Sequence, residues 1–271
     1  MQSNRQVVVS GSFDDVRLGH LRFLEEASKL GDVNVLLWPD EVVEAVTGKA
    51  PKFSLAEREY FVDAVRYVKR VCVAGDGRDR LREVEGLAPG VWVVDEAGHS
   101  AGKEAFCKGA GIEYHVLTGK DLAGAPTPAA QAPTGRKKVV ATGCYDWFHS
   151  GHVRFCEEVS ELGDLYVVVG HDANILLLKG PGHPLFPEAE RRYVVGSIKY
   201  VTQALVSSGN GWMDAEPEIE RIKPDMYAVN EDGDKPEKRE FCAKHGLEYV
   251  VLKRTPKPGL AARSSTNLRG F

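Results

Sequence analysis

Two histidines stand where the sequence turns from a strand-like run into a helix-like one. The motif His149-Ser150-Gly151-His152 follows Gly143 and the apolar run 138–142. Gly143 permits a tight turn, and Gly151 leaves room for a ligand near the backbone. A helix start offers free N–H groups and the positive end of a dipole, which suit phosphate. Two imidazoles there can donate hydrogen bonds to phosphate oxygens and stabilise charge moving onto a leaving group, unless this is a surface loop with incidental histidines.

Basic and hydroxyl side chains that suit phosphates recur further along the same half. Arginine and lysine pair with phosphate oxygens, and a Ser/Thr-rich helix start adds hydroxyl and N–H donors. The candidates are Lys179, Arg191, Arg254, Thr255, Ser264, Ser265 and Thr266. Two have plain structural alternatives, because Lys179 could be a solvated lysine in a loop and Arg191 could pair with a neighbouring glutamate.

The elements that must position these residues alternate between strand-like and helix-like patterns. Residues 138–142 and 165–169 are short apolar runs typical of buried parallel strands. Between them, apolar residues recur at helical spacing from Val153 to Leu162, and Gly163 stands where the helix should end.

The later part of this half continues the alternation. We expect helices over residues 188–198 and after Met213, the latter with Asp214 as its N-cap, and strands over 226–229 and 249–252. The pattern predicts a doubly wound α/β fold with a parallel sheet. Ligands of such folds bind at the carboxyl ends of the strands, where the histidine turn lies.

The chain contains an internal repeat. Residues 11–32 and 143–164 share twelve identical residues at a constant offset of 132. Further matches join residues 51–58 to 184–191 and Phe106-Cys107 to Phe241-Cys242. Two copies of this length indicate a fused pair of domains rather than a solenoid. We therefore expect two tandem Rossmann-like domains.

The junction between the copies has the composition of a linker. Residues 121–137 are rich in Ala, Pro, Gly and Thr and show no periodicity. The expected organisation is a first domain over 1–120, a linker over 121–137 and a second domain over 138–271.

Composition and charge limit the classes of protein. The 271 residues are 43% hydrophobic and 27% charged, as in soluble globular proteins, and a net charge of −4 with scattered basic residues gives no nucleic-acid footprint. Apolar runs reach strand length only, so neither a transmembrane segment nor a leader peptide is expected. The five cysteines lack metal-binding or C-x-x-C spacing. They are expected to be free thiols, most of them buried, in a cytoplasmic protein.

The histidine turn resembles the H-x-G-H signature of the cytidylyltransferase-like nucleotidyltransferase superfamily, and the similarity continues through nearly all of the second copy. Lys179-Gly-Pro with Glu190-Arg191 is similar to the Lys and E-x-x-Arg region of phosphoethanolamine and glycerol-3-phosphate cytidylyltransferases. Arg254-Thr255 with Arg263-Ser-Ser-Thr-Asn267 resembles their R-T-x-G-I-S-T-T motif, interrupted here by residues 256–262.

The resemblance implies roles for individual residues. His149 and His152 would bind the triphosphate and stabilise the transition state, and Lys179 would neutralise the phosphates of acceptor and donor. The residues implied to bind the nucleotide and its phosphates are Gly143, Tyr145, Asp146, Gly151, Arg191, Asn230, Asp232, Arg254, Thr255, Ser264, Ser265 and Thr266. Asn230 and Asp232 belong to the region that meets the base, or form only a polar turn. Asp146 helps to hold a metal, or equally caps the turn.

The implied reaction is direct displacement on a nucleoside triphosphate. The phosphate of a small phosphomonoester, such as phosphoethanolamine or a polyol phosphate, attacks the α-phosphorus, and pyrophosphate leaves. CTP is the expected donor and ATP its rival, with Mg²⁺ carried on the nucleotide phosphates. A non-catalytic module that senses nucleotides or phosphoesters is the alternative from another class, and the two intact histidines argue against it.

The first copy departs from the motif at the decisive position. Arg17-Leu18-Gly19-His20 replaces the histidine turn, and no Ser/Thr-rich segment precedes the linker. Arginine can still bind phosphate, so binding is not excluded. We expect this copy to be catalytically silent and to act as the partner in an internal pseudo-dimer, to which further oligomerisation can be added.

Overall fold

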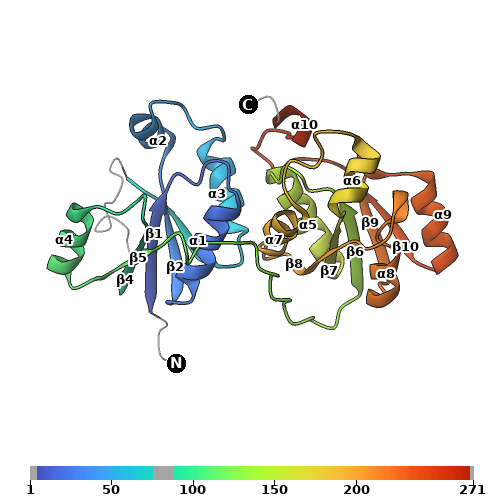
Figure 1. Ribbon diagram of the computed structural model, residues 1–271, viewed down its shortest axis with the longest axis horizontal. Helices are drawn as coiled ribbons and strands as arrows, with labels where there is room; N and C mark the ends of the chain where they lie inside the picture. Colours follow the sequence, from blue (N-terminus) through green and yellow to red (C-terminus); the bar gives the residue numbers. More distant parts are fainter. Residues whose placement is uncertain (1–4, 76–87, 269–271) are drawn as a thin grey trace. The chain divides into compact units, whose positions relative to one another are not determined.

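The computed structural model describes residues 5–75 and 88–268, without the side chains of residues 266 and 267 (Figure 1). By its internal contacts the chain divides into two compact units, Met1–Gly124 and Ala125–Phe271, named unit 1 and unit 2 below. Each unit contains one five-stranded sheet.

Unit 1 is an alternating α/β unit. Its elements are β1 (Gln6–Gly11), α1 (Leu18–Ser28), β2 (Asp32–Leu37), α2 (Asp40–Thr47), α3 (Leu55–Asp63), β3 (Val68–Val73), β4 (Val91–Asp95), α4 (Ala101–Ala110) and β5 (Glu113–Leu117). The strands are all parallel, in the order β3-β2-β1-β4-β5.

Unit 2 repeats this plan. Its elements are β6 (Lys138–Gly143), α5 (Ser150–Leu162), β7 (Asp164–Val169), α6 (Asp172–Lys179), α7 (Glu188–Gly196), β8 (Val201–Val206), α8 (Glu216–Ile222), β9 (Met226–Asn230), α9 (Pro236–His245), β10 (Glu248–Leu252) and α10 (Ser265–Leu268), with 3-10 turns over Gly211–Met213 and Glu231–Gly233. The parallel order β8-β7-β6-β9-β10 matches that of unit 1. The predicted fold class, two tandem Rossmann-like doubly wound domains, is confirmed (Figure 1).

The apolar strands of unit 2 are buried because helices cover both faces of the sheet. On one face Val140, Val168 and Tyr227 pack with apolar residues of α8 and α9. Helices α5 and α7 contact β6, β7 and β8. Strand β7 is buried along its whole length, which explains its uninterrupted run of apolar residues.

The site of the histidine turn follows from the strand order. Strand β6 pairs with β7 on one side and with β9 on the other. The chain builds the sheet from β6 through β7 to β8 and then crosses back to β9 on the other side of β6. A crevice forms at such a switch point, outside the carboxyl ends of the two strands. The turn after β6 and the segment after β9 therefore meet at one edge of the sheet.

Three local expectations about unit 2 can be compared with the structure. Residues 172–179 form helix α6, so Lys179 ends a helix rather than lying in a loop. Asp214 does not cap α8, because Ala215 holds that position and the Asp214 carboxylate accepts a hydrogen bond from the Ser207 hydroxyl at 2.6 Å. Gly163 does end α5, but with an extended backbone, and it is needed because a Cβ would lie 2.1 Å from the Lys137 carbonyl oxygen.

The segment expected as a linker is fastened to unit 2 over part of its length. The backbone N–H of Gln131 donates to the Thr202 carbonyl at 2.8 Å, and its side-chain amide donates to the Val201 carbonyl at 2.6 Å. Thr134 donates from both N–H and hydroxyl to the Asp164 carboxylate. These bonds run along the β8 edge and the start of β7, so residues 131–134 belong structurally to unit 2.

The cysteines are free, as the composition predicted. Four of the five are buried, and Cys144 is half-buried. Burial raises the pKa of the Cys156 thiol to about 12. Within residues 5–75 and 88–268, no helix is both long and apolar enough to cross a membrane.

Candidate active site

The two histidines of the H-x-G-H turn lie together at the start of α5. His149 is the N-cap of this helix and is buried, and His152 lies one turn further on. Their ring centroids are 4.0 Å apart. The two rings line a single cavity at the carboxyl ends of β6 and β9.

Backbone N–H groups determine the tautomers of both rings. The Gly151 N–H donates to His149 Nδ1 at 3.1 Å, and the His149 N–H donates to His152 Nδ1 at 3.3 Å. A neutral imidazole whose Nδ1 accepts a hydrogen bond carries its proton on Nε2. Each ring therefore carries its proton on Nε2, the nitrogen that can donate to a phosphate oxygen.

His152 is held neutral. Burial lowers its pKa well below the usual 6.5, and electrostatic interaction with His149, Arg254 and Lys179 lowers the pKa further. Its ring stacks on Phe148, with centroids 5.2 Å apart, and Tyr145 meets it edge-on at 5.4 Å. These aromatic contacts orient the ring. Because its pKa is low, the ring is a hydrogen-bond donor rather than a cation at neutral pH.

Gly151 is required by the geometry of His149. A Cβ on Gly151 would lie 2.9 Å from Cε1 and 3.0 Å from Nδ1 of that ring. Gly143, at the end of β6, is restricted in the same way by the Tyr145 ring at 3.0 Å. Both glycines of the motif thus make room for the aromatic and imidazole rings of the site.

The substitution Gly151→Ala should displace the His149 ring and lower kcat/KM for nucleotidyl transfer about 10- to 100-fold, because misplaced catalytic groups are costly. The measurement is pyrophosphate release by the purified chain. Gly19→Ala is the matched control, since Gly19 holds the same position in α1 and no heavy atom lies within 4 Å of its Cβ. Equal rates for both variants and the parent chain would contradict this account of Gly151.

Two adjoining cavities make up the site. The histidine cavity has a volume of about 140 Å³, and a second cavity of about 250 Å³ lies beside it. Both are lined by Gly151, Phe155, Asn230 and Arg254, so they are continuous along the start of α5 and the end of β9. Together they form one site, in which the two histidines line only the smaller cavity.

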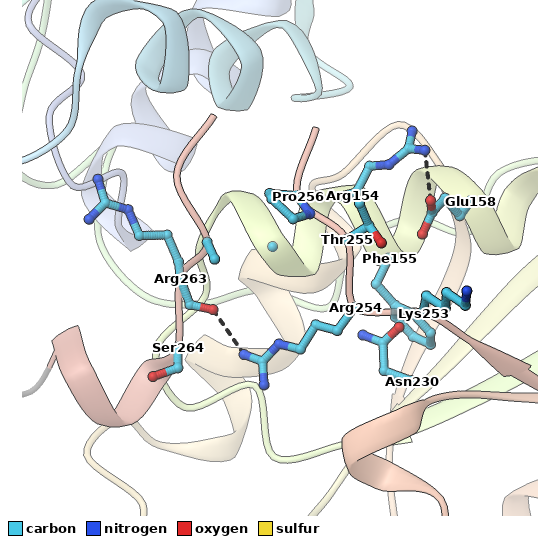
Figure 2. Close-up of a pocket in the computed structure, with 12 residues that line it drawn as sticks. Arg154, Phe155, Glu158, Asn230, Lys253, Arg254, Thr255, Pro256, Arg263 and Ser264 are labelled. Carbon is cyan, nitrogen blue, oxygen red and sulfur yellow. Dashed lines mark hydrogen bonds and ion pairs between the residues drawn. The ribbon is translucent and has the colours of Figure 1, made fainter. Parts of the chain in front are cut away.

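Arg254 connects the two halves of the interrupted motif. Its Nη2 donates to the Arg263 carbonyl at 2.9 Å (Figure 2). Its Nη1 pairs with the Asp232 carboxylate. Thr255 and Ser264 line the second cavity with it. The extra residues 256–262 therefore loop out, and Arg254 still meets the second half of the motif.

The structure brings together most of the candidate residues. Lining one or both cavities are Gly143, Tyr145, His149, Gly151, His152, Asn230, Asp232, Arg254, Thr255 and Ser264. Lys179 lines neither cavity and is exposed at the end of α6, although its charge reaches His152. The Ser265 hydroxyl donates to the Trp147 carbonyl at 3.1 Å. Thr266 lies in α10, and its side chain is outside the described part of the structure.

Asp146 and Arg191 stabilise the backbone around the site through hydrogen bonds to main-chain groups. Asp146 Oδ1 accepts the N–H groups of Leu185 and Phe186 at 2.6 and 3.1 Å. Arg191 is buried and donates to the carbonyls of Phe186 and Cys144 at 2.8 and 2.6 Å, and to Asp172 at 2.6 Å. Neither side chain lines the cavities, so the capping and structural alternatives describe them better than phosphate contact.

Unit 1 contains the same supports. Asp14 accepts the N–H groups of Lys52 and Phe53, and Arg58 donates to the carbonyls of Phe53, Ser12 and Trp38. The bonds persist in a copy without the histidine pair. Their persistence indicates that they serve the fold rather than the chemistry.

Sequence reasoning missed several residues that line the site, above all Lys238. This lysine from α9 lines the histidine cavity, and its ammonium lies 5.7 Å from the centre of the Tyr227 ring. Burial lowers its pKa below the usual 10.5. The repeat could have identified it, because Lys103 precedes Phe106-Cys107 just as Lys238 precedes Phe241-Cys242.

Sequence reasoning also missed residues that line the second cavity. Among them are Arg154, Lys253, Arg263 and Phe155, the last of which lines the histidine cavity too (Figure 2). Arg154 pairs with Glu157 and Glu158, at 2.9 and 2.6 Å. Arg154 and Phe155 repeat Arg22 and Phe23 of the first copy, a sequence signal that helix periodicity alone does not explain.

Comparison with known proteins agrees with this geometry. A family model described as Cytidylyltransferase-like matches residues 140–270. The FAD synthase of Ferroglobus placidus is 38% identical over 135 residues, which are 49% of this chain and 85% of that protein. The bifunctional protein HldE of Nitratiruptor sp. is 31% identical over 99 residues, 36% of this chain and 21% of that protein.

A solved structure, the lipopolysaccharide core biosynthesis protein of Thermoplasma volcanium, is 26% identical and covers 45% of this chain and 99% of its own, with a TM-score of 0.38. The family match spans the histidine turn, the strand after it and the interrupted motif at the end of unit 2. The chain belongs to the cytidylyltransferase-like nucleotidyltransferase superfamily and is a nucleotidyltransferase enzyme.

Proposed function

We propose that unit 2 transfers AMP from ATP to the phosphate of a small phosphomonoester and releases pyrophosphate. The observation that carries this proposal is the pair of His149 and His152, each with Nδ1 bound to a backbone N–H and Nε2–H left as the donor. Two fixed donors beside a helix start suit the oxygens of a triphosphate, where charge accumulates as pyrophosphate departs.

In this reaction an oxygen of the acceptor phosphate forms a bond to the α-phosphorus, and the bond from that phosphorus to the bridging oxygen of pyrophosphate breaks. The protein needs no covalent intermediate, because positioning and charge stabilisation suffice. The imidazoles donate to the phosphate chain, and Arg254 and Lys238 add positive charge at the wall of the same cavity. Lys179, at the end of α6, is proposed to meet the acceptor phosphate.

ATP is preferred as the donor because of the FAD synthase relatives. FAD consists of FMN joined to AMP through a pyrophosphate bridge, so a synthase that acts by nucleotidyl transfer moves AMP. The similarity at 38% identity supports the same donor for this chain, and FMN is then the first acceptor to test. The CTP expected from the sequence rests on motifs that the whole superfamily shares.

Magnesium is proposed to enter with the nucleotide. In the described ranges, no group of three or more His, Cys, Asp or Glu side chains could hold a metal ion. Asp146, the candidate metal ligand, uses Oδ1 to bind two backbone N–H groups. A divalent ion on the triphosphate would neutralise phosphate charge, and the residues of the site supply the remaining donors.

A second candidate is transfer of CMP from CTP to phosphoethanolamine or a polyol phosphate. The tandem arrangement of two copies and the segment Lys179-Gly180-Pro181 favour it. Under either candidate unit 1 is proposed to be silent, because Arg17 stands in place of the first histidine.

The test is pyrophosphate release from ATP and from CTP, each with FMN, phosphoethanolamine, phosphocholine and glycerol 3-phosphate. We expect release with ATP and FMN, abolished by His149→Ala. Release only with CTP and phosphoethanolamine or glycerol 3-phosphate would replace the first candidate by the second. Binding of ATP or CTP without release from any pair would support the sensing module instead.

A further inference from the structure

Unit 1 contains a cavity of its own at the place that corresponds to the active site of unit 2. Its volume is about 520 Å³, and it lies at the carboxyl ends of β1 and β4, beside the start of α1. Side chains of three kinds line it: the aromatic rings of Phe13 and Trp38, the basic groups of Arg17 and Lys103, and the Asp95 carboxylate. A purely structural copy has no evident need of a mixed, open crevice at its switch point.

Two donors of the active site have direct counterparts in this cavity. Lys103 lies over the Trp92 ring at 5.8 Å, as Lys238 lies over the Tyr227 ring at 5.7 Å. His20 Nδ1 accepts the Arg17 N–H at 3.2 Å, which leaves Nε2–H as its donor, as in His152. The basic groups that are proposed to bind phosphate in unit 2 therefore have counterparts in unit 1.

The parts that support displacement at phosphorus are missing or altered. Arg17 replaces the first imidazole and pairs with Asp15 at 2.6 Å, and a guanidinium with five N–H donors can bind a phosphate as well. After β5 the chain turns at Thr118, which donates to Asp121, and then runs into the segment between the copies. In the described residues of unit 1, no arm follows β5 in the way that residues 253–256 and 262–264, which line the second cavity, follow β10 in unit 2.

Asp95 is placed to meet a ribose. It stands at the end of β4, where Asn230 ends β9, and its Oδ1 accepts the Gly98 N–H at 2.7 Å. A carboxylate at this position is a good acceptor for ribose hydroxyls. The aromatic side chains of Phe13, Phe23 and Trp38 offer surfaces on which a base can stack.

From this arrangement we propose that unit 1 binds a nucleoside monophosphate and does not convert it. The phosphate lies between Arg17, Lys103 and the start of α1, the ribose meets Asp95, and the base packs against the aromatic rings. The proposal concerns a site separate from the one that performs nucleotidyl transfer. It therefore does not depend on the donor or acceptor of that reaction.

The experiment uses the full chain with unit 2 disabled by His149→Ala and Arg254→Ala, and measures AMP binding by isothermal titration calorimetry. We expect one AMP per chain. Lys103→Met should weaken binding by at least tenfold while leaving its aliphatic stem over the Trp92 ring. Adenosine and ribose 5-phosphate should each bind at least tenfold more weakly than AMP, because one lacks the phosphate and the other the base.

Arg17→Leu is the second variant, in case Lys103→Met impairs folding, and thermal melting checks both. In the chain with an intact unit 2, Lys103→Met and Arg17→Leu should leave pyrophosphate release unchanged, so failure of the transferase proposal would appear in a separate measurement. No AMP binding to the chain with unit 2 disabled would overturn the proposal. Binding that neither variant weakens would overturn it as well.

Discussion

His152→Ala is expected to lower kcat for pyrophosphate release by about 100- to 1000-fold, the cost of removing one preorganised donor to a developing oxyanion. The physical reason is the fixed Nε2–H of a neutral ring, oriented by the His149 N–H at 3.3 Å and by stacking on Phe148. Alanine removes the donor, and water in the gap does not restore its orientation. Steady-state kinetics with the best donor and acceptor pair measures the effect.

His20→Ala in unit 1 is the matched control. His20 has the same position after its glycine and the same Nδ1 bond to a backbone N–H, at 3.2 Å. If unit 2 alone performs the chemistry, this variant keeps the kcat of the parent chain. Equal losses from the two variants would contradict the assignment of one working site, and a loss in KM alone for His152→Ala would indicate ground-state binding without transition-state stabilisation.

Arg191→Met is expected to destabilise unit 2 by about 3 kcal/mol, near the lower end for removing one partner of a buried ion pair. The side chain is almost fully buried, whereas its partner Asp172 is 43% exposed and can be solvated. The larger part of the loss comes from the carbonyls of Phe186 and Cys144, which lose their donors inside the fold. Hydrogen exchange of unit 2 peptides, together with urea denaturation, measures the change.

Arg58→Met provides the comparison within the same chain. Arg58 makes the equivalent bonds in unit 1, so exchange should rise in unit 1 peptides while nucleotidyl transfer per folded molecule is retained. Were Arg191→Met to leave exchange in unit 2 unchanged and raise only KM for the nucleotide, the arginine would contact phosphate rather than support the fold.

Much of the fold could be read from the sequence because its signals are local. Valine-rich runs bounded by glycine predicted β6 and β7, and the spacing of apolar residues predicted α5. The repeat at a constant offset required two copies of one fold. Helix α6 escaped prediction because its run Ile175-Leu-Leu-Leu178 has no clear period, and it is a helix whose three leucines are substantially exposed.

The sequence also showed which residue types the site contains. It did not show which of these residues face the cavity and which stabilise the backbone around it. Asp146 and Arg191 have the residue types of a phosphate or metal site, and only their bonds to loop carbonyls and N–H groups reveal that they brace the turn. The reverse holds for Lys238, which reads as an ordinary helix lysine. It becomes part of the site because β9 lies next to β6 in the sheet.

By itself, the sequence determined the doubly wound fold and the histidine turn, because both depend on periodicity or on neighbours within a few residues. It also determined the duplication, because whole segments recur at a constant offset. Tertiary structure alone decided which basic residues face the cavities. Arg254 and Arg263 are separated by an insertion, yet their 2.9 Å hydrogen bond joins the two halves of the motif. Such contacts depend on strand order and on the path of a loop, and neither is encoded at any fixed spacing along the chain.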